Sequence, residues 1–291
     1  MIKYVSPLRY PGGKLKVVDY VKQLMEINDL MGGTYIEPYA GGASVALSLL
    51  FSKHASKIKI NDIDRTIYAF WHSVLNETDA LCRLINDTPI TMDVWVAQHE
   101  RQKHKDEVGL LELGFSTFFL NRTNRSGILN GGVIGGKEQR GEYKIDARYN
   151  KRELIERIEH VAGYADLIEL TSMDAVALIK RYKRTPAAKT FCYLDPPYYV
   201  KGQDLYLNYY RDEDHKDIAE AIKKFKGQWI ISYDAVDFIS ELYKGYRQKE
   251  YYLSYSAGNS AKGKEIMIYS DGLIIPDVEI VKLKRAKNTN K

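Results

Sequence analysis

The sequence predicts an α/β fold, in which a seven-stranded mixed sheet carries helices on both faces and a mostly helical insertion interrupts the chain. Three observations lead to this prediction. Short apolar runs alternate with stretches of helical period up to residue 70 and again from residue 160. The alternation stops between them, and two strand-like runs follow one another near the C-terminus. We therefore predict one domain over 1–70 and 160–285, an insertion over 71–159 and a disordered basic tail over 286–291.

The composition limits the class of protein. The chain has 43 lysine and arginine residues against 38 aspartates and glutamates, and its net charge of +5 is compatible with a nucleic-acid partner without requiring one. The two cysteines, Cys82 and Cys192, are far apart and form no CxxC pair, so we expect free thiols in a reducing cytosol. The six histidines show no metal-ligand spacing, and no apolar run reaches the length of a membrane span. We therefore expect no metal site and no membrane association.

The first segment with a binding signature is residues 8–14, Leu-Arg-Tyr-Pro-Gly-Gly-Lys. A glycine turn of this kind brings the backbone close to a ligand, and Lys14 follows directly behind it. A helix is predicted from Val17 to Met25, because apolar residues recur there at helical spacing. The alternative is an ordinary glycine turn that only opens this helix.

A cofactor-type unit follows. A strand is predicted over 34–36, then a bend over 37–43 with the sequence Glu-Pro-Tyr-Ala-Gly-Gly-Ala, then an apolar helix over 44–51. A strand, a glycine-rich bend and a helix in this order are typical of a nucleotide-type cofactor site. Glu37 in the bend would repel a pyrophosphate, but it would attract a cation such as an amino group or a sulfonium.

A second strand over 57–60 ends in Asn61 and Asp62. An acidic residue at the end of the second strand usually binds the hydroxyls of a ribose. Asp62 could instead cap a helix that begins at Ile63, and the two roles are compatible.

The insertion falls into two parts. Residues 72–113 have a polar, helical pattern, whereas residues 114–152 are rich in glycine and locally basic. The basic residues of this second part are Arg122, Arg125, Lys137, Arg140, Lys144, Arg148, Lys151 and Arg152. We predict a surface loop and hairpin that contacts phosphates and base edges. The alternative is a flexible, hydrated loop without a partner.

The alternation of strands and helices resumes after the insertion. Strands are predicted over 166–170, 190–194 and 228–232, helices over 175–182, 214–225 and 235–243, and a closing antiparallel pair over 251–255 and 265–269.

The strand over 190–194 leads into Asp195-Pro196-Pro197-Tyr198. Proline has no N–H and a fixed φ, so two in a row keep the chain extended and leave the Pro196 carbonyl as a free acceptor. Asp195 supplies a second acceptor and Tyr198 a flat face. This set suits a planar heterocycle with an exocyclic NH₂ group. The alternative is a proline-rich turn in which Tyr198 only packs.

These motifs, taken in order, resemble the Dam-type (D12 class) adenine-N6-specific DNA methyltransferases over nearly the whole chain. The matching segments are 8–14, 37–44, 61–63, 119–122 with Gly127, 195–198 and 264–269. Two positions depart from the family pattern. Ala43 stands where the family usually has the last glycine of its cofactor loop, and Asn130 stands where many relatives carry a base-reading arginine.

The resemblance implies a Rossmann-like class I methyltransferase fold with a DNA-recognition insertion. It implies transfer of a methyl group from S-adenosylmethionine, which becomes S-adenosylhomocysteine, to N6 of a flipped-out adenine in double-stranded DNA. The implied catalytic residues are Asp195, Pro196, Pro197 and Tyr198, and the implied cofactor-binding residues are Tyr10, Lys14, Glu37, Gly41, Asp62 and Asp195. The implied DNA-binding residues are Arg9, Asn121, Arg122, Arg125, Ser126, Asn130, Arg148 and Tyr149.

In this mechanism Asp195, with an ordinary carboxylate pKa of about 4, polarises the amine and does not deprotonate it before attack. We further expect a cytoplasmic, bacterial or phage-encoded monomer with a cognate restriction endonuclease as partner. One alternative is a methyltransferase of the same fold that acts on RNA or on a protein amide, although such enzymes usually have asparagine at the position of Asp195. The other alternative is a catalytically inactive DNA-binding relative.

Overall fold

The computed structural model describes residues 5–9, 14–182, 189–200, 210–254 and 262–281. Tyr10 and the predicted tail over 286–291 lie outside these ranges. None of the helices within them combines the length and the apolar character that crossing a membrane requires.

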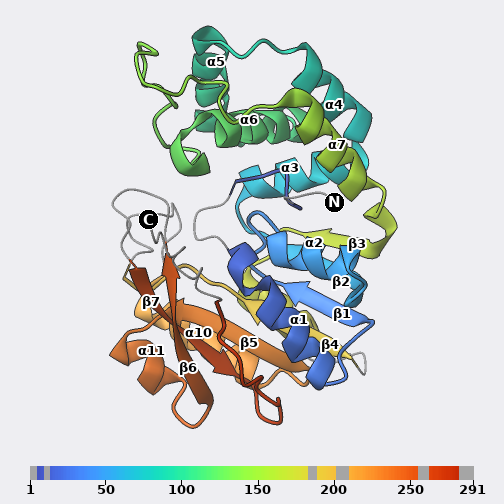
Figure 1. Ribbon diagram of the computed structural model, residues 1–291, viewed down its shortest axis with the longest axis vertical. Helices are drawn as coiled ribbons and strands as arrows, with labels where there is room; N and C mark the ends of the chain where they lie inside the picture. The colour runs from blue at the N-terminus through green and yellow to red at the C-terminus, as the bar shows by residue number, and fades with distance from the viewer. Residues whose placement is uncertain (1–4, 10–13, 183–188, 201–209, 255–261, 282–291) are drawn as a thin grey trace, which may run out of the picture.

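The core of the molecule is one seven-stranded sheet with the order β3-β2-β1-β4-β5-β7-β6 (Figure 1). Strands β1 to β5 pair in parallel, whereas β7 is antiparallel to both of its neighbours, β5 and β6. The strands are β1 (Gly33–Glu37), β2 (Ala55–Asn61), β3 (Ile168–Thr171), β4 (Thr190–Leu194), β5 (Gln228–Asp234), β6 (Arg247–Ser254) and β7 (Lys262–Tyr269). This mixed sheet confirms the predicted Rossmann-like class I methyltransferase fold.

Helices cover both faces of the sheet, because side chains of successive strand residues point to opposite sides. In β4, Phe191 and Tyr193 belong to one core cluster, whereas Cys192 and Leu194 belong to the other. The first cluster includes side chains of α1 (Val18–Ile27), α2 (Ser44–Phe51) and α3 (Arg65–Asn76), and a short 3₁₀ turn, η1 (Lys14–Val17), precedes α1. The second includes side chains of α8 (Ala175–Tyr182), α10 (Asp212–Lys223) and α11 (Asp237–Leu242).

The predicted elements agree closely with the observed ones. The helices over 44–51 and 175–182 and the strand over 190–194 have the predicted bounds, and the closing antiparallel pair is confirmed. The strands predicted over 34–36, 57–60 and 228–232 extend beyond those bounds, whereas the helix predicted over 235–243 is shorter, at Asp237–Leu242.

The insertion forms a helical layer at one end of the molecule (Figure 1). Its helices are α4 (Thr78–Asp87), α5 (Met92–Lys103), α6 (Leu110–Thr123) and α7 (Lys151–Ala162), with the 3₁₀ turn η2 (Arg125–Gly127). A further 3₁₀ turn, η3 (Ala165–Leu167), follows α7 and leads into β3. The predicted boundary at residue 70 falls inside α3, which packs against α6. Aromatic residues of α6 share the core cluster of the sheet, so the insertion and the sheet domain have a continuous hydrophobic core.

The prediction of a surface loop was wrong for residues 114–123. They belong to α6, and every side chain from Leu113 to Thr123 is buried. Phe115, Phe118 and Phe119 supply apolar contacts, while Ser and Thr hydroxyls bond to backbone carbonyls, as Thr117 does with that of Leu113 at 2.8 Å. The uncharged polar side chains that suggested a loop therefore have hydrogen-bond partners inside the protein. The predicted hairpin is reduced to an isolated antiparallel bridge between Asn124 and Val133.

Candidate active site

The bend between β1 and α2 is held in a strained but well-connected conformation. Gly41 and Ala43 both have φ of 46°, in the left-handed region that favours glycine. For an alanine this conformation costs about 1 kcal/mol. The N-terminus of α2 has no capping side chain of its own, and the carboxylate of Glu37 accepts the hydrogen bond of the Ala46 amide at 3.0 Å instead. Glu37 therefore fixes this bend.

Asp62 closes the same bend from the end of β2. One of its oxygens accepts a hydrogen bond from the Gly41 amide at 2.8 Å, and the other accepts one from the Asp64 amide at 3.0 Å. Asp62 does not cap the next helix, because α3 begins at Arg65 and its cap is Asp64, which accepts from the Thr66 amide at 2.9 Å. Asp62 is thus placed at the bend and keeps lone pairs for a ligand.

Both carboxyls ionise with difficulty. Burial raises the pKa of Glu37 to about 8, against the opposing hydrogen bond from Ala46, and the charges of Asp195 and Asp62 raise it further. Burial likewise raises the pKa of Asp62 to about 7. Glu37 lies close enough to Asp62 and to Asp195 to be influenced by the charge of each, at the end of the sheet where the parallel strands finish. A region of crowded acidic groups fits a cationic ligand.

Asn61 has a structural role that the sequence did not reveal. Its amide nitrogen donates to the carbonyls of Pro38 (2.9 Å) and Met173 (3.0 Å), and its oxygen accepts from the Thr171 hydroxyl and the Met173 amide, both at 2.8 Å. Asn61 therefore joins the ends of three neighbouring strands. Ile63, next to Asp62, is 53% exposed and provides an apolar surface beside the residue predicted to bind ribose. The sequence did not single out Ile63 for this role.

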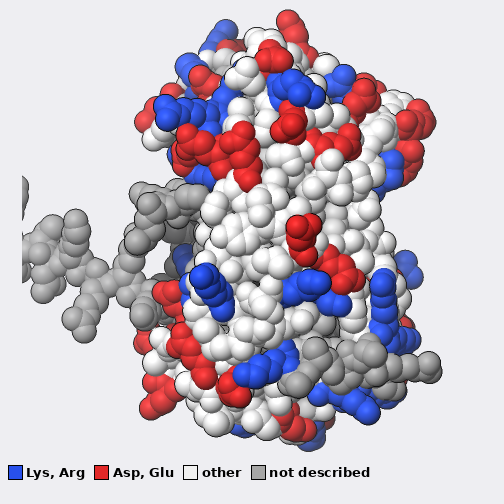
Figure 2. Space-filling model, turned by 90° about the vertical axis from the view of Figure 1, so that its right-hand side faces the viewer, with Lys and Arg blue, Asp and Glu red and all other residues white. Residues whose placement is uncertain are grey.

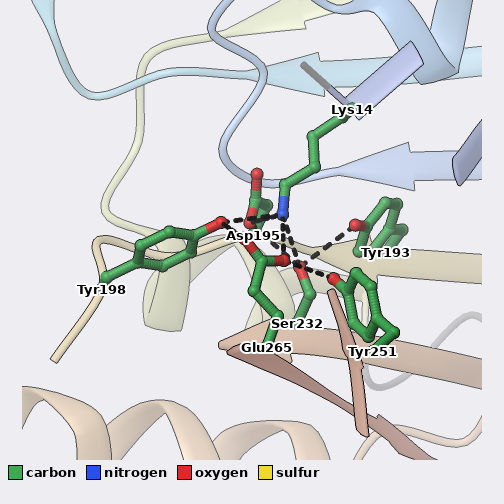
Figure 3. Close-up of polar contacts among 7 residues, drawn as sticks. All are labelled: Lys14, Tyr193, Asp195, Tyr198, Ser232, Tyr251 and Glu265. Atoms are coloured by element: carbon green, nitrogen blue, oxygen red, sulfur yellow. Dashed lines mark hydrogen bonds and ion pairs between the residues drawn. The ribbon is translucent and has the colours of Figure 1, made fainter. Parts of the chain in front are cut away.

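The motif residue Asp195 lies directly after β4 and faces a cluster of polar side chains (Figure 3). Its Oδ1 atom lies 3.0 Å from the Lys14 ammonium and accepts a hydrogen bond from the Ser232 hydroxyl at 2.9 Å. Within the described residues its second oxygen, Oδ2, receives no hydrogen bond, and Figure 3 shows one carboxylate oxygen pointing away from the cluster. The Pro196 carbonyl likewise accepts none within the described part of the chain. Two free acceptors therefore stand side by side in the sequence.

The cluster around Asp195 contains residues that the sequence did not single out. Glu265 of β7 accepts hydrogen bonds from the hydroxyls of Tyr198 (2.6 Å) and Tyr251 (2.5 Å), and the Lys14 ammonium lies 3.2 Å from its Oε2 atom. The only available signal was an acidic residue in an otherwise apolar strand, Glu-Ile-Met-Ile-Tyr. A glutamate is almost never fully buried unless it is paired, so a buried position in this strand requires a partner.

The pKa of Asp195 is not ordinary. Burial raises it, Lys14 opposes this shift, and the charge of Glu265 adds to it. The expectation of an unperturbed carboxylate is therefore corrected. Burial alone would lower the pKa of Lys14, but the charges of Asp195, Tyr193, Tyr251 and Glu265 raise it well above its ordinary value, so Lys14 is a cation.

The end of the motif is fixed by two interactions. Tyr198 is only 6% exposed, and its hydroxyl is held by Glu265 and by Lys14 at 3.0 Å, so the flat face predicted for stacking is largely covered in this structure. Beyond it, both oxygens of Asp234 accept backbone amides, those of Tyr199 and Val200, each at 2.8 Å. Asp234, at the end of β5, is a further residue that the motifs did not reveal.

Among the predicted DNA-binding residues, Arg125, Asn130 and Arg148 are exposed, and Arg9 and Ser126 are partly exposed. They belong to the loop over 124–150 and to the N-terminal segment that contacts it. The view turned by 90° shows basic and acidic side chains intermingled on the insertion, above a broad uncharged band (Figure 2). The described residues of that side form no uniformly basic area.

Two predicted DNA contacts are corrected. Asn121 is 2% exposed, and its carboxamide bonds to the Arg9 amide and carbonyl, each at 2.7 Å, and to the Gly127 carbonyl at 2.9 Å. Tyr149 is also buried, with its ring against Phe118 and Phe119. Neither side chain faces solvent, because both lie in the shared core where α6 meets the loop.

Arg122 is an unusual buried cation. It is 7% exposed, and its Nε atom has no hydrogen-bond partner among the residues that the structure describes. Burial lowers its pKa to about 9, and the charges of Arg157 and Arg9 add to this effect. A guanidinium so placed would be stabilised by an anion.

Over the described ranges, no group of three or more histidine, cysteine, aspartate or glutamate side chains could hold a metal ion.

Comparison with known proteins matches most of the chain to one family. A family model described as D12 class N6 adenine-specific DNA methyltransferase matches residues 10–256. The chain is 23% identical to the type II methyltransferase M.MjaIII of Methanocaldococcus jannaschii over 271 residues, 84% of this chain and 89% of the relative. It is 24% identical to the type II methyltransferase M.CviBI of Paramecium bursaria Chlorella virus NC1A over 254 residues, 85% of this chain and 90% of the relative.

Among solved structures, the chain is similar to the SAM dependent methyltransferase from Agrobacterium tumefaciens. The TM-score is 0.42 at 8% identity, over 88% of this chain and 61% of that one.

Proposed function

The chain belongs to the D12 class of N6 adenine-specific DNA methyltransferases, and on that premise we propose that Asp195 and Pro196 hold the amino group that is methylated. The reaction is transfer of a methyl group from S-adenosylmethionine to N6 of adenine in DNA. One observation supports these roles above all: Oδ2 of Asp195 and the carbonyl of Pro196 carry no hydrogen bond within the described residues, whereas Oδ1 of Asp195 is held by Lys14 and Ser232. An exocyclic NH₂ group has two N–H donors and needs two such acceptors.

These two acceptors activate a poor nucleophile. The lone pair of adenine N6 is delocalised into the ring, and accepting both of its hydrogens draws the lone pair out of conjugation. The stabilisation grows as positive charge develops on N6, so it favours the transition state over the bound substrate. S-adenosylmethionine, when bound, supplies an electrophilic methyl group on a sulfonium.

The raised pKa of Asp195 makes its carboxylate a stronger hydrogen-bond acceptor, yet leaves it far too weak to deprotonate a neutral amine. Asp195 therefore polarises N6, and the proton leaves during or after transfer. Because N6 is paired inside a duplex, the base must be flipped out, at a cost of about a few kcal/mol.

We place the methyl donor at the bend formed by Glu37, Gly41 and Asp62. The fit rests on the donor set: acidic side chains for a cationic ligand, carboxylate lone pairs for ribose hydroxyls, and exposed Ile63 for a planar base. Lys14 is retained as a residue at the border between this site and Asp195. Tyr10, proposed for the same site, lies outside the described residues. The direct test is digestion of treated DNA to nucleosides, which should yield N6-methyladenine and no methylcytosine.

Cofactor affinity should rise with pH between 6 and 8. Asp62 and Glu37, with pKa values of about 7 and about 8, are mostly protonated at pH 6 and ionise as the pH rises. Their negative charge favours the sulfonium, so the dissociation constant should fall by up to about tenfold per pH unit below pH 7. Isothermal titration calorimetry with the cofactor measures this dissociation constant at each pH. Asp62→Asn should remove the part of the rise centred near pH 7, and a dissociation constant independent of pH would contradict the assignment.

We propose that the loop over 124–150 binds the DNA, with Arg125, Arg148, Asn130 and Ser126 on its surface and Arg9 beside it. Arg122 is retained as a phosphate contact, because a buried guanidinium without a partner on Nε favours an anion. Asn130, in place of an arginine, is proposed to alter base reading at that position.

Neutralising exposed arginines of this loop should flatten the salt dependence of DNA binding. Arg125→Gln and Arg148→Gln should each reduce the slope of log affinity against log salt by about 0.9, because one phosphate fewer is neutralised and fewer counterions are released. Fluorescence anisotropy at several salt concentrations measures this slope. The matched control is Arg83→Gln. Arg83 is an exposed residue of α4, at the other side of the insertion, and its replacement should leave the slope unchanged. An unchanged slope in the loop variants would remove them from the interface.

We further propose that the protein is a monomer that acts in the cytoplasm, where its DNA and its methyl donor meet. The two similar type II methyltransferases favour a cognate restriction endonuclease as partner.

A further inference from the structure

The direction of β7 places an acidic residue at the catalytic edge of the sheet. Because β7 is antiparallel to β5, its first residues lie beside the last residues of β5, and Glu265 is opposite Asp234 in this register. The same residue pairs with Tyr251 of β6 on the other side. The side chain of Glu265 is fully buried, at 0% exposure. A buried carboxylate is rare unless a cation and hydrogen bonds compensate it, so the partners of Glu265 explain how its charge is tolerated.

Lys14 lies between two carboxylates (Figure 3). Its ammonium is 3.0 Å from Oδ1 of Asp195 and 3.2 Å from Oε2 of Glu265. Hydroxyls of Tyr198 and Tyr251 donate to the two oxygens of Glu265 and hold its carboxylate in place. Two negative groups therefore share one positive group, at a site with little solvent.

This sharing matters for Asp195. If Asp195 were the sole counterion of Lys14, the two would form a buried neutral pair, and the carboxylate would be a weaker acceptor for an incoming amine. A second carboxylate offsets the charge of Lys14 and leaves net negative charge on the cluster. Glu265 also remains an ion-pair partner of Lys14 when the carboxylate of Asp195 accepts a hydrogen bond from the substrate.

We propose that Glu265 is a positioning residue for methyl transfer, which holds Lys14 between two carboxylates so that the charge of Lys14 does not weaken Asp195 as an acceptor for the adenine amino group. The inference rests on the proposed role of Asp195. Among the residues that the structure describes, the titratable groups that face Glu265 are Lys14 from η1, Tyr193 and Asp195 from β4 and its end, Tyr198 from the motif and Tyr251 from β6.

The test is the pH profile of kcat for Glu265→Gln. The negative charge of Glu265 raises the pKa of both Asp195 and Lys14, so both values should fall in the variant. The rate requires ionised Asp195 and protonated Lys14, and both the acidic and the alkaline limit of the profile should therefore move to lower pH. The plateau should fall about tenfold, less than for loss of a group that touches the substrate.

Glu250→Gln is the matched control, because Glu250 pairs with Lys264 at 2.8 Å on the exposed side of the same two strands and carries the same charge. It should keep the wild-type limits and plateau. A lower plateau with unmoved limits in Glu265→Gln would reduce Glu265 to a structural residue and overturn the proposal. If that variant melts below the assay temperature, Glu265→Asp replaces it, with a smaller shift of both limits in the same direction expected and wild-type limits overturning the proposal. Full activity of Asp195→Ala would instead overturn the proposed site itself.

Discussion

Replacing Asp195 with alanine should lower kcat for methyl transfer to unmethylated DNA by about 10²–10³-fold, the usual cost of losing one preorganised group at the reacting atom. The variant loses one of the two acceptors for N6, and it leaves Lys14 with Glu265 as its remaining carboxylate partner. Transfer of a labelled methyl group under single-turnover conditions measures the chemical step apart from product release.

The loss should reside in the chemical step and not in folding. Asp195 is near the surface of its cluster, with 24% of its side chain exposed, so the melting temperature should change little. Asp217→Ala, on the exposed side of α10, is the matched control for removing an aspartate and should retain wild-type kcat. Near-normal transfer by Asp195→Ala would show that another residue activates the amine.

Replacing Asn121 with alanine should lower the free energy of unfolding by about 3 kcal/mol, because a buried polar group left without its partner costs about 1–3 kcal/mol. Three hydrogen bonds are removed, two to the backbone of Arg9 and one to the Gly127 carbonyl. Gly127 is packed so closely against Arg9, with φ of 78°, that no side chain could fill the gap. Urea denaturation measures the change.

This second variant also tests whether the insertion positions Lys14. Asn121 holds the segment that leads to Lys14, so kcat should fall together with stability. Asn130→Ala, at an exposed position of the same insertion, should change the free energy of unfolding by less than about 0.5 kcal/mol. An Asn121→Ala protein as stable as the wild type would contradict the structural role assigned here.

The corrections at residues 114–123 share one cause. The segment over 114–123 has polar residues that predict a loop, but Phe115, Phe118 and Phe119 recur at helical spacing and drive it into the core. Once α6 is buried, Asn121 faces Arg9 instead of DNA. In this segment the helical spacing of the apolar residues predicts the structure better than the polar composition does.

The local pattern of the sequence determined which residues form the strands and helices and where the acidic and glycine residues stand at strand ends, and it predicted Asp195-Pro196-Pro197-Tyr198 as the reactive motif. These features depend on neighbours within a few positions. The tertiary structure alone decided that Glu265 shares Lys14 with Asp195, and that Asn121 holds Arg9. Lys14 and Glu265 are 251 positions apart, and Arg9 and Asn121 are 112 apart. Such contacts are set by strand order and helix packing, and no local spacing in the chain records them.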